Sequence, residues 1–348
     1  MTDTYAGSEY KKTMLKLREL LAELPPFCAE FFRGIEHETL VRSRYAYAID
    51  FRTFFTFLIQ EPEFSTDSIR SLTLPDLDRV TVSTVESYLS YISFYNDDAN
   101  NEVLNGERAK KRKLSSLRAL YKYFCKKEKL KTNAPSLVDL PVVRDKAIVR
   151  LEPDEVANLL DIVQEGEGLS ETQKRYHKRT QVRDLAILTL FLGTGIRISE
   201  LVGINMDDVN FSANEFTILR KGGKQDILVF GEEARAALLA YMLEREGISP
   251  QPGHEEALFL SLQNKRITVR AVENLVQKYA RLATPLKKIS PHKLRSTYGT
   301  MLYRETGDIY LVADVLGHKD VNTTRKHYAA VSEDRRRIAA KVIKLRED

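Results

Sequence analysis

The chain has 348 residues, which is too long for a single hydrophobic core and suits two domains. Hydrophobic residues make up 43% and charged residues 30%, a balance that excludes a disordered chain and is typical of globular proteins. The net charge of +5 is a small excess, so the placement of the basic residues matters more than their total.

No segment predicts export or a membrane anchor. The first residues lack the apolar core of a signal peptide. The longest apolar run, residues 185–193, is too short to span a bilayer and predicts a buried core helix instead. The only cysteines, Cys28 and Cys125, are too few for a cysteine zinc site and too far apart to suggest a disulfide framework. We therefore expect a cytoplasmic protein without membrane contact.

The first part of the chain, residues 1–135, is predicted to be entirely helical. Apolar residues recur at helical spacing over residues 38–61, and a second helix begins near a cap at Ser83 or Thr84. A third helix is predicted over residues 106–130. Its apolar stripe contains Leu114, Leu117, Leu120, Tyr121 and Phe124.

The polar side of this third helix carries charge of almost one sign. Few acidic residues stand at helical spacing to pair with it. A solvated face explains most such runs, but a one-signed surface on a nearly neutral protein is also what a polyphosphate backbone needs. The basic residues are Arg108, Lys110, Lys111, Arg112, Lys113, Arg118, Lys122, Lys126 and Lys127.

Residues 136–150 are predicted to link two domains, because prolines are frequent there and apolar periodicity is weak. A helix restarts with Pro153 in its first turn, and residues 164–180 predict a loop or a solvated helical excursion. The pattern around Gly222-Gly223 predicts a β-hairpin. The remainder to Leu345 is predicted to be helical. The second domain, residues 151–348, is therefore expected to be mainly α with a small antiparallel sheet.

Two arginines of the second domain stand where they could bind phosphate. Arg197 and Glu200 are expected to share one face of a helix that follows Gly195, although a structural ion pair explains the spacing equally well. Another helix is predicted to begin at the Ser290-Pro291 pair, with serine as the cap and proline in the first helical position, and His292 and Arg295 fall on one side of its first turn. A helix N-terminus attracts phosphate, but a capped surface helix would have the same sequence.

Three further positions are weak signals when each is taken alone. Lys221 and Lys224 flank the hairpin turn, where lysines are usually only solvated. His318 follows a glycine that ends a helix, and Tyr328 is one of 16 tyrosines. A metal site is disfavoured, because the histidines lack acidic or cysteine partners at zinc spacing. The histidines considered were His254, His292, His318 and His327.

Taken in order, the segments GTGIRISEL, RKGGK, SPHKLRST, LGHKD and TTRKHY resemble the tyrosine recombinase family, the integrases and Xer-type recombinases of bacteria and phages. The resemblance covers the whole second domain, while the basic helical first domain resembles the family's core-binding domain more loosely. It implies that the catalytic residues are Arg197, Lys221, His292, Arg295, His318 and Tyr328, with Glu200 in support.

The resemblance also implies the reaction. Tyr328 would attack a DNA phosphate and leave a 3′-phosphotyrosine and a free 5′-hydroxyl, so that the bond energy is kept and neither ATP, metal nor other cofactor is needed. Arg197 and Arg295 would clamp the phosphate oxygens, and His318 would add a donor. Lys221 would protonate the leaving oxygen, and His292 would act as general base or further donor.

The implied partner is double-stranded DNA carrying a specific recombination site, bound by a homotetramer on two duplexes. The tail after Tyr328, with an apolar stripe, would dock on a neighbouring protomer, and an accessory directionality protein could take part. DNA contacts are expected from both domains, and in the first domain from Arg42, Arg44, Lys110, Lys111, Arg112, Lys113, Arg118 and Lys122.

Several biological roles remain open. A Xer-type enzyme that resolves chromosome dimers is favoured over a mobile-element integrase, because only about 35 residues precede the first clear helix and leave little room for an arm-binding domain. A type IB topoisomerase shares the same nucleophile chemistry. A catalytically silent DNA-binding protein is the alternative that is not an enzyme.

Overall fold

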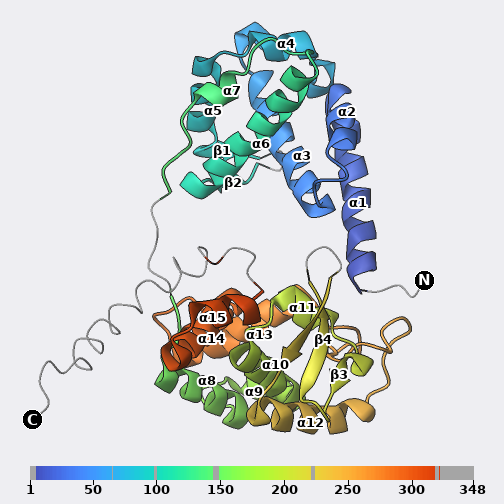
Figure 1. Ribbon diagram of the computed structural model, residues 1–348, viewed down its shortest axis with the longest axis vertical. Helices are drawn as coiled ribbons and strands as arrows, with labels where there is room; N and C mark the ends of the chain where they lie inside the picture. Colours follow the sequence, from blue (N-terminus) through green and yellow to red (C-terminus); the bar gives the residue numbers. More distant parts are fainter. Residues whose placement is uncertain are drawn as a thin grey trace, which may run out of the picture. The chain divides into compact units, whose positions relative to one another are not determined.

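The computed structural model describes residues 5–64, 66–97, 100–143, 149–220, 224–317 and residue 321. The chain divides into two compact units, Met1–Lys146 and Ala147–Asp348 (Figure 1). Each unit buries its own set of hydrophobic side chains. No helix of the described segments is long and apolar enough to cross a membrane.

The core of the first unit is formed by aromatic side chains of α2, α3 and α6. Phe27 meets Phe55 and Phe124 edge-on, with ring centroids 5.9 and 5.8 Å apart, and so joins the three helices. The helices are α1 (Tyr5–Glu23), α2 (Phe27–Gly34), α3 (Val41–Leu58), α4 (Leu74–Arg79), α5 (Val82–Tyr91), α6 (Glu107–Lys126) and α7 (Ala134–Leu137), with 3₁₀ turns at Pro62–Phe64 and Ile69–Ser71.

The expectation that this unit is entirely helical is wrong. Strands β1 (Phe94–Asn96) and β2 (Glu102–Leu104) form an antiparallel hairpin directly after α5. Aromatic residues that favour strands follow the end of α5, and Asn and Asp residues that favour turns follow them. The expected cap is also misplaced, because α5 is capped by Thr81, whose Oγ1 accepts from the Thr84 N–H at 3.2 Å.

Two segments of the first unit differ from what the sequence suggested. Residues 5–34, expected to precede the first clear helix, form α1 and α2, and Leu17 and Leu20 of α1 are buried where it packs along α3. At the other end, α7 and Val138 pack into the same core, so the beginning of the expected linker belongs to this unit.

The second unit is organised around α10, which packs against α8, α12 and α14. Residues 186–192 of α10 are all buried, as the apolar run predicted. The helices are α8 (Pro153–Glu165), α9 (Glu171–His177), α10 (Gln181–Thr194), α11 (Ile198–Gly203), α12 (Glu232–Glu246), α13 (Val269–Ala283), α14 (Pro291–Thr306) and α15 (Ile309–Val315), with a 3₁₀ turn at Met206–Asp208.

The predicted hairpin is confirmed as part of a three-stranded antiparallel sheet in the order β3-β4-β5. Strand β4 (Glu215–Leu219) pairs with β3 (Val209–Asn210) and β5 (Gln225–Val229). The mainly α class is therefore confirmed. The remainder is not wholly helical, however: residues 248–268 between α12 and α13 are irregular and contain an isolated bridge between Leu260 and Arg266.

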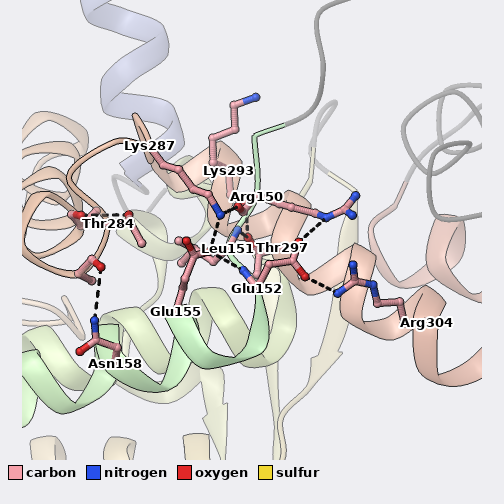
Figure 2. A network of polar contacts seen from close by, with 12 residues as sticks. Arg150, Leu151, Glu152, Glu155, Asn158, Thr284, Lys287, Lys293, Thr297 and Arg304 are labelled. Carbon is pink, nitrogen blue, oxygen red and sulfur yellow. Dashed lines mark hydrogen bonds and ion pairs between the residues drawn. The ribbon is translucent and has the colours of Figure 1, made fainter. Parts of the chain in front are cut away.

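The first residues of the second unit are fastened to α14 (Figure 2). The backbone N–H of Leu151 donates to Thr297 Oγ1 at 3.0 Å, and Arg304 Nη1 donates to Glu152 Oε2 at 2.6 Å. The Arg304 contact holds the pKa of the Glu152 carboxyl below its usual value. These contacts stabilise α14, the helix that carries two of the predicted catalytic residues.

The polar stretch before α10 contains a buried histidine that the sequence did not reveal. His177, expected in a solvated excursion, is only 5% exposed. The Tyr279 hydroxyl donates to Asp184 Oδ2 at 3.0 Å. His177 Nδ1 lies 3.0 Å from the Tyr279 hydroxyl oxygen, so Nδ1 must carry the proton and donate to that oxygen. Its Nε2 is buried and has no hydrogen-bond partner within the described segments. Protonation of Nε2 would therefore bury an unpaired charge.

We expect the His177→Phe variant to resist mild acid better than the wild type. Burial, and next the charge of Lys278, lower the pKa of His177. A lowered pKa means that the unfolded chain takes up the proton first, so stability is lost as the pH falls below about 6.5. Thermal unfolding of both proteins between about pH 7 and about pH 5 tests this, and equal acid sensitivity of the two would contradict it.

Candidate active site

Arg197 stands at the start of α11 and is oriented by Glu200. The Arg197 N–H donates to Glu200 Oε2 at 2.9 Å, and its Nη1 donates to Oε1 at 2.8 Å. Glu200 is buried, whereas the Arg197 side chain is 37% exposed. The carboxylate therefore neutralises one edge of the guanidinium and fixes its direction, and part of the group remains open to solvent.

Arg295 lies in the second turn of α14 and is buried. Helix α14 begins at Pro291 as predicted, with Ser290 in the cap position, although the Ser290 side chain makes no capping hydrogen bond. Arg295 Nη1 donates to the Gly195 carbonyl at 2.5 Å. His292, one turn earlier on the same helix, is exposed. The two predicted residues therefore differ in access to solvent.

Both arginines reach the C-terminal end of α15. Nη2 of Arg197 donates to the carbonyls of Leu316 and Gly317 at 3.2 and 3.1 Å, and Nη2 of Arg295 also donates to the Leu316 carbonyl. Carbonyls at a helix C-terminus lack partners within the helix and carry partial negative charge, which attracts cations. Segments about 100 residues apart thus bring two guanidinium groups to one oxygen.

Gly195 makes this convergence sterically feasible. Its φ of +62° is a left-handed conformation that favours glycine. A Cβ here would lie 2.5 Å from the Tyr298 ring and 2.8 Å from the Leu316 side chain. The glycine between α10 and α11 therefore lets α14 and the end of α15 approach the backbone closely.

Four predicted features lie outside the described segments. Lys221, His318 and Tyr328 lie outside them, as does the tail helix expected after Tyr328. Lys224, the competing hairpin lysine, is exposed at the start of β5. Of the predicted catalytic residues, the structure thus describes Arg197, His292 and Arg295, together with the supporting Glu200.

The arrangement has the chemistry of an anion site. Two guanidinium groups are held in fixed positions by a carboxylate and backbone carbonyls, which is the pre-organisation needed to stabilise charge that develops on phosphate oxygens. Within the described segments, no cluster of three or more His, Cys, Asp or Glu side chains could hold a metal ion.

Comparison with known proteins identifies the chain. Residues 149–335 match the phage integrase family. The tyrosine recombinase XerC of Caldanaerobacter subterraneus subsp. tengcongensis is 33% identical over 90% of this chain and 86% of its own length. The chain belongs to the phage integrase family. It is a site-specific tyrosine recombinase, an enzyme that cleaves and rejoins DNA.

Other relatives also match this chain over most of its length. The tyrosine recombinase XerS of Lactococcus lactis subsp. cremoris is 26% identical over 92% of this recombinase and 96% of its own chain. XerH in a post-cleavage complex with palindromic difH covers 94% of this chain and 89% of its own, with a TM-score of 0.64 at 18% identity. The Tn1549 transposon integrase with transposon right end DNA covers 90% and 99%, with a TM-score of 0.61 at 19% identity. Both likenesses concern the fold.

The predicted DNA-binding residues of the recombinase's first unit fall into two groups. Lys111, Arg112 and Lys122 are exposed on α6, whereas the side chain of Lys110 is only 18% exposed and pairs with Glu107 at 3.2 Å. Arg42 is also exposed and lies 3.5 Å from Glu9. Acidic partners are thus more frequent than the sequence suggested, because some of them come from other helices.

The other group does not lie on an open basic face. Lys113 is buried, and its Nζ lies 3.3 Å from Asp50, a buried residue of α3 that Arg112 also contacts. Arg44 is buried and donates to Glu36 at 2.8 Å. Lys113 and Arg44 therefore do not lie on the accessible surface that contacts with DNA would need. Helical periodicity did not reveal that they pair with Asp50 and Glu36.

Arg118 also has a role in packing. Its Nε donates to the Pro135 carbonyl at 2.9 Å, and its Nη2 donates to the Val138 carbonyl, so it fastens α7 and the following residues to α6. Sequence reasoning also missed Arg220, which directly follows β4 and contacts the same turn as Arg197 and Arg295. Its only signal was its place beside Lys221.

Proposed function

We propose that this recombinase cuts one DNA strand with Tyr328 and holds it as a 3′-phosphotyrosyl intermediate. In the reverse step, the 5′-hydroxyl of a partner strand attacks the phosphotyrosine and restores the phosphodiester. The observation that carries the proposal is the convergence of Arg197 and Arg295 on the Leu316 carbonyl, two residues before His318 in the chain. A phosphate placed beside that carbonyl would meet both guanidinium groups.

The proposed roles follow from charge and exposure. Arg197 and Arg295 stabilise the non-bridging oxygens, and Glu200 orients Arg197. His318 adds a donor, Lys221 protonates the departing 5′-oxygen, and His292 acts as general base or further donor. The exposure of His292 supports a role that depends on contact with DNA.

DNA is proposed to bind both units. The first domain, predicted from the sequence as residues 1–135, supplies a core-binding surface, and the catalytic domain is predicted as residues 151–348 beyond a linker predicted at residues 136–150. The exposed Lys111 and Lys122 on α6, beside the partly buried Lys110, support contacts with the DNA backbone, which make binding strongly salt-dependent. Recombinase structures of similar fold were solved with difH and with transposon DNA.

The biological role that we favour is Xer-like resolution at a single short site, acting in the cytoplasm as a homotetramer on two duplexes. Similarity to XerS and XerC relatives along nearly their whole length supports this role. Integration or excision of a mobile element is the alternative, supported by the fold that the chain shares with the Tn1549 integrase. An accessory directionality protein would belong to that alternative.

A nicked suicide DNA that spans the region beside the protein's own gene tests the proposal. Because the nick releases the 5′-hydroxyl strand, cleavage becomes irreversible, and we expect a protein–DNA adduct that resists detergent. Absence of an adduct on any fragment would indicate a silent DNA-binding protein. Relaxation of a supercoiled plasmid that lacks the site would instead indicate a topoisomerase.

A further inference from the structure

Arg220 directly follows β4 and is held from several directions. Its backbone N–H donates to the Lys224 carbonyl at 2.8 Å, which closes the mouth of the hairpin. Its Nη2 donates to the Val315 carbonyl at the end of α15, at 3.2 Å. Its Nε lies 2.6 Å from Asp226 Oδ2 on β5, an ion pair without good hydrogen-bond geometry. The side chain is only 13% exposed.

The Arg220 guanidinium occupies the space that a side chain at position 317 would need. A Cβ on Gly317 would lie 1.2 Å from Arg220 Nη1 and 2.3 Å from its Cζ. Gly317 also has a φ of +58°, in the left-handed region that favours glycine. Arg220 and Gly317 are therefore packed against each other directly.

This contact places Arg220 on the turn that already holds the two clamp arginines. The Val315 carbonyl accepts from Arg220, and the next two carbonyls accept from Arg197 and Arg295. Three arginines from β4, α11 and α14 thus share three successive carbonyls. The Arg220 contacts therefore join the hairpin to this turn.

We propose that Arg220 is a positioning residue for the leaving-group side of the cleavage reaction. It joins the position immediately before Lys221 to the end of α15, three residues before His318. Only an arginine suits this role, because its separate N–H groups can reach a carboxylate and a carbonyl at once, whereas lysine presents a single ammonium. The proposal rests on the proposed function, in which Lys221 protonates the leaving oxygen.

The chemistry of the leaving group separates positioning from a merely structural role. During cleavage the Tyr328 oxygen bonds to phosphorus and its proton passes to a general base, the role proposed for His292. The P–O5′ bond breaks, and its electron pair leaves with O5′, which takes a proton from the general acid. If sulfur replaces O5′, the leaving thiol has a pKa of about 8.5 and departs without that proton. The sulfur substrate should therefore restore the cleavage rate of a variant only if that variant is defective in proton delivery.

The test uses the full-length protein and two forms of the suicide DNA. The adduct assay first locates the scissile phosphate, and the leaving atom at that phosphate is then either oxygen or sulfur. We expect Arg220→Gln to cleave the oxygen substrate roughly 100-fold more slowly, as misplacement of a catalytic group does, and to recover on the sulfur substrate. Arg197→Ala should stay slow on both. Arg235→Gln is the matched control, because Arg235 donates to Asn214 Oδ1 at 3.0 Å just before the start of β4.

The outcomes distinguish a failure of the positioning role of Arg220 from a failure of the proposed function. Sulfur rescue of Arg220→Gln supports the positioning role, and a wild-type rate on oxygen, or a slow rate on both substrates, overturns it. Lys221→Ala tests the proposed function separately. If the sulfur substrate does not restore cleavage by this variant, the assignment of Lys221 as the general acid fails. If Arg220→Gln does not fold, Asp226→Asn, which removes only the ion-pair partner, replaces it, with a smaller loss and the same rescue expected.

Discussion

Tyr328→Phe is expected to bind its DNA site as the wild type does and to form no covalent adduct. Phenylalanine keeps the ring but removes the oxygen that attacks phosphorus, so no phosphotyrosine can form. DNA affinity should persist because it depends mainly on contacts between basic residues and phosphates. Gel-shift titration measures the binding, and denaturing electrophoresis of the suicide-DNA reaction measures the adduct.

The control for this substitution is Tyr310→Phe. Tyr310 lies in α15, is 71% exposed and has no assigned role in the reaction, so its loss should leave adduct formation unchanged. An adduct that persists in Tyr328→Phe would refute the assignment of the nucleophile. Peptide mapping of the wild-type adduct would then show whether the neighbouring His327 or another residue carries the DNA.

Arg295→Lys is expected to lower the cleavage rate by about 10²- to 10³-fold, the usual effect of removing a donor from a pre-organised anion site. Lysine keeps the charge but cannot donate to the Gly195 and Leu316 carbonyls while it also binds a phosphate. The adduct rate under single-turnover conditions measures the loss. Because one buried carbonyl is expected to lose its donor, the free energy of unfolding should also fall by about 1–3 kcal/mol.

Arg245→Lys separates the effect on the reaction from the effect on stability. Arg245 is also a buried arginine that donates to backbone carbonyls, those of Glu255 and Ala257, at 2.9 and 3.1 Å. We expect it to lose comparable stability and to keep its cleavage rate at a temperature where it remains folded. If Arg245→Lys lost as much cleavage activity as Arg295→Lys, the clamp role of Arg295 would not stand.

Local features of the sequence predicted several elements correctly. The Ser290-Pro291 pair predicted the start of α14, glycines predicted the break before α11, and paired strand formers predicted β4 and β5. These signals succeed because capping, turn geometry and side-chain alternation are decided within a few residues. Where a local signal was weak, as in the β1–β2 hairpin, the prediction failed.

Charges were predicted less well, because burial is decided by partners that are distant in the chain. Lys113 belongs to a run of basic residues, and only the approach of α3 shows that it pairs with buried Asp50. His177 belongs to a polar stretch, and only the approach of α13 supplies Tyr279. Helical periodicity assigns a side chain to a face, but it does not identify what covers that face.

The sequence by itself determined the family, through the residue types and order of its short segments, and hence the class of reaction. Only the tertiary structure decided that Arg197, Arg295 and Arg220 meet on three successive carbonyls at the end of α15. The physical reason is that these contacts join residues 21 to 120 positions apart, so they exist only after the helices and the sheet have packed.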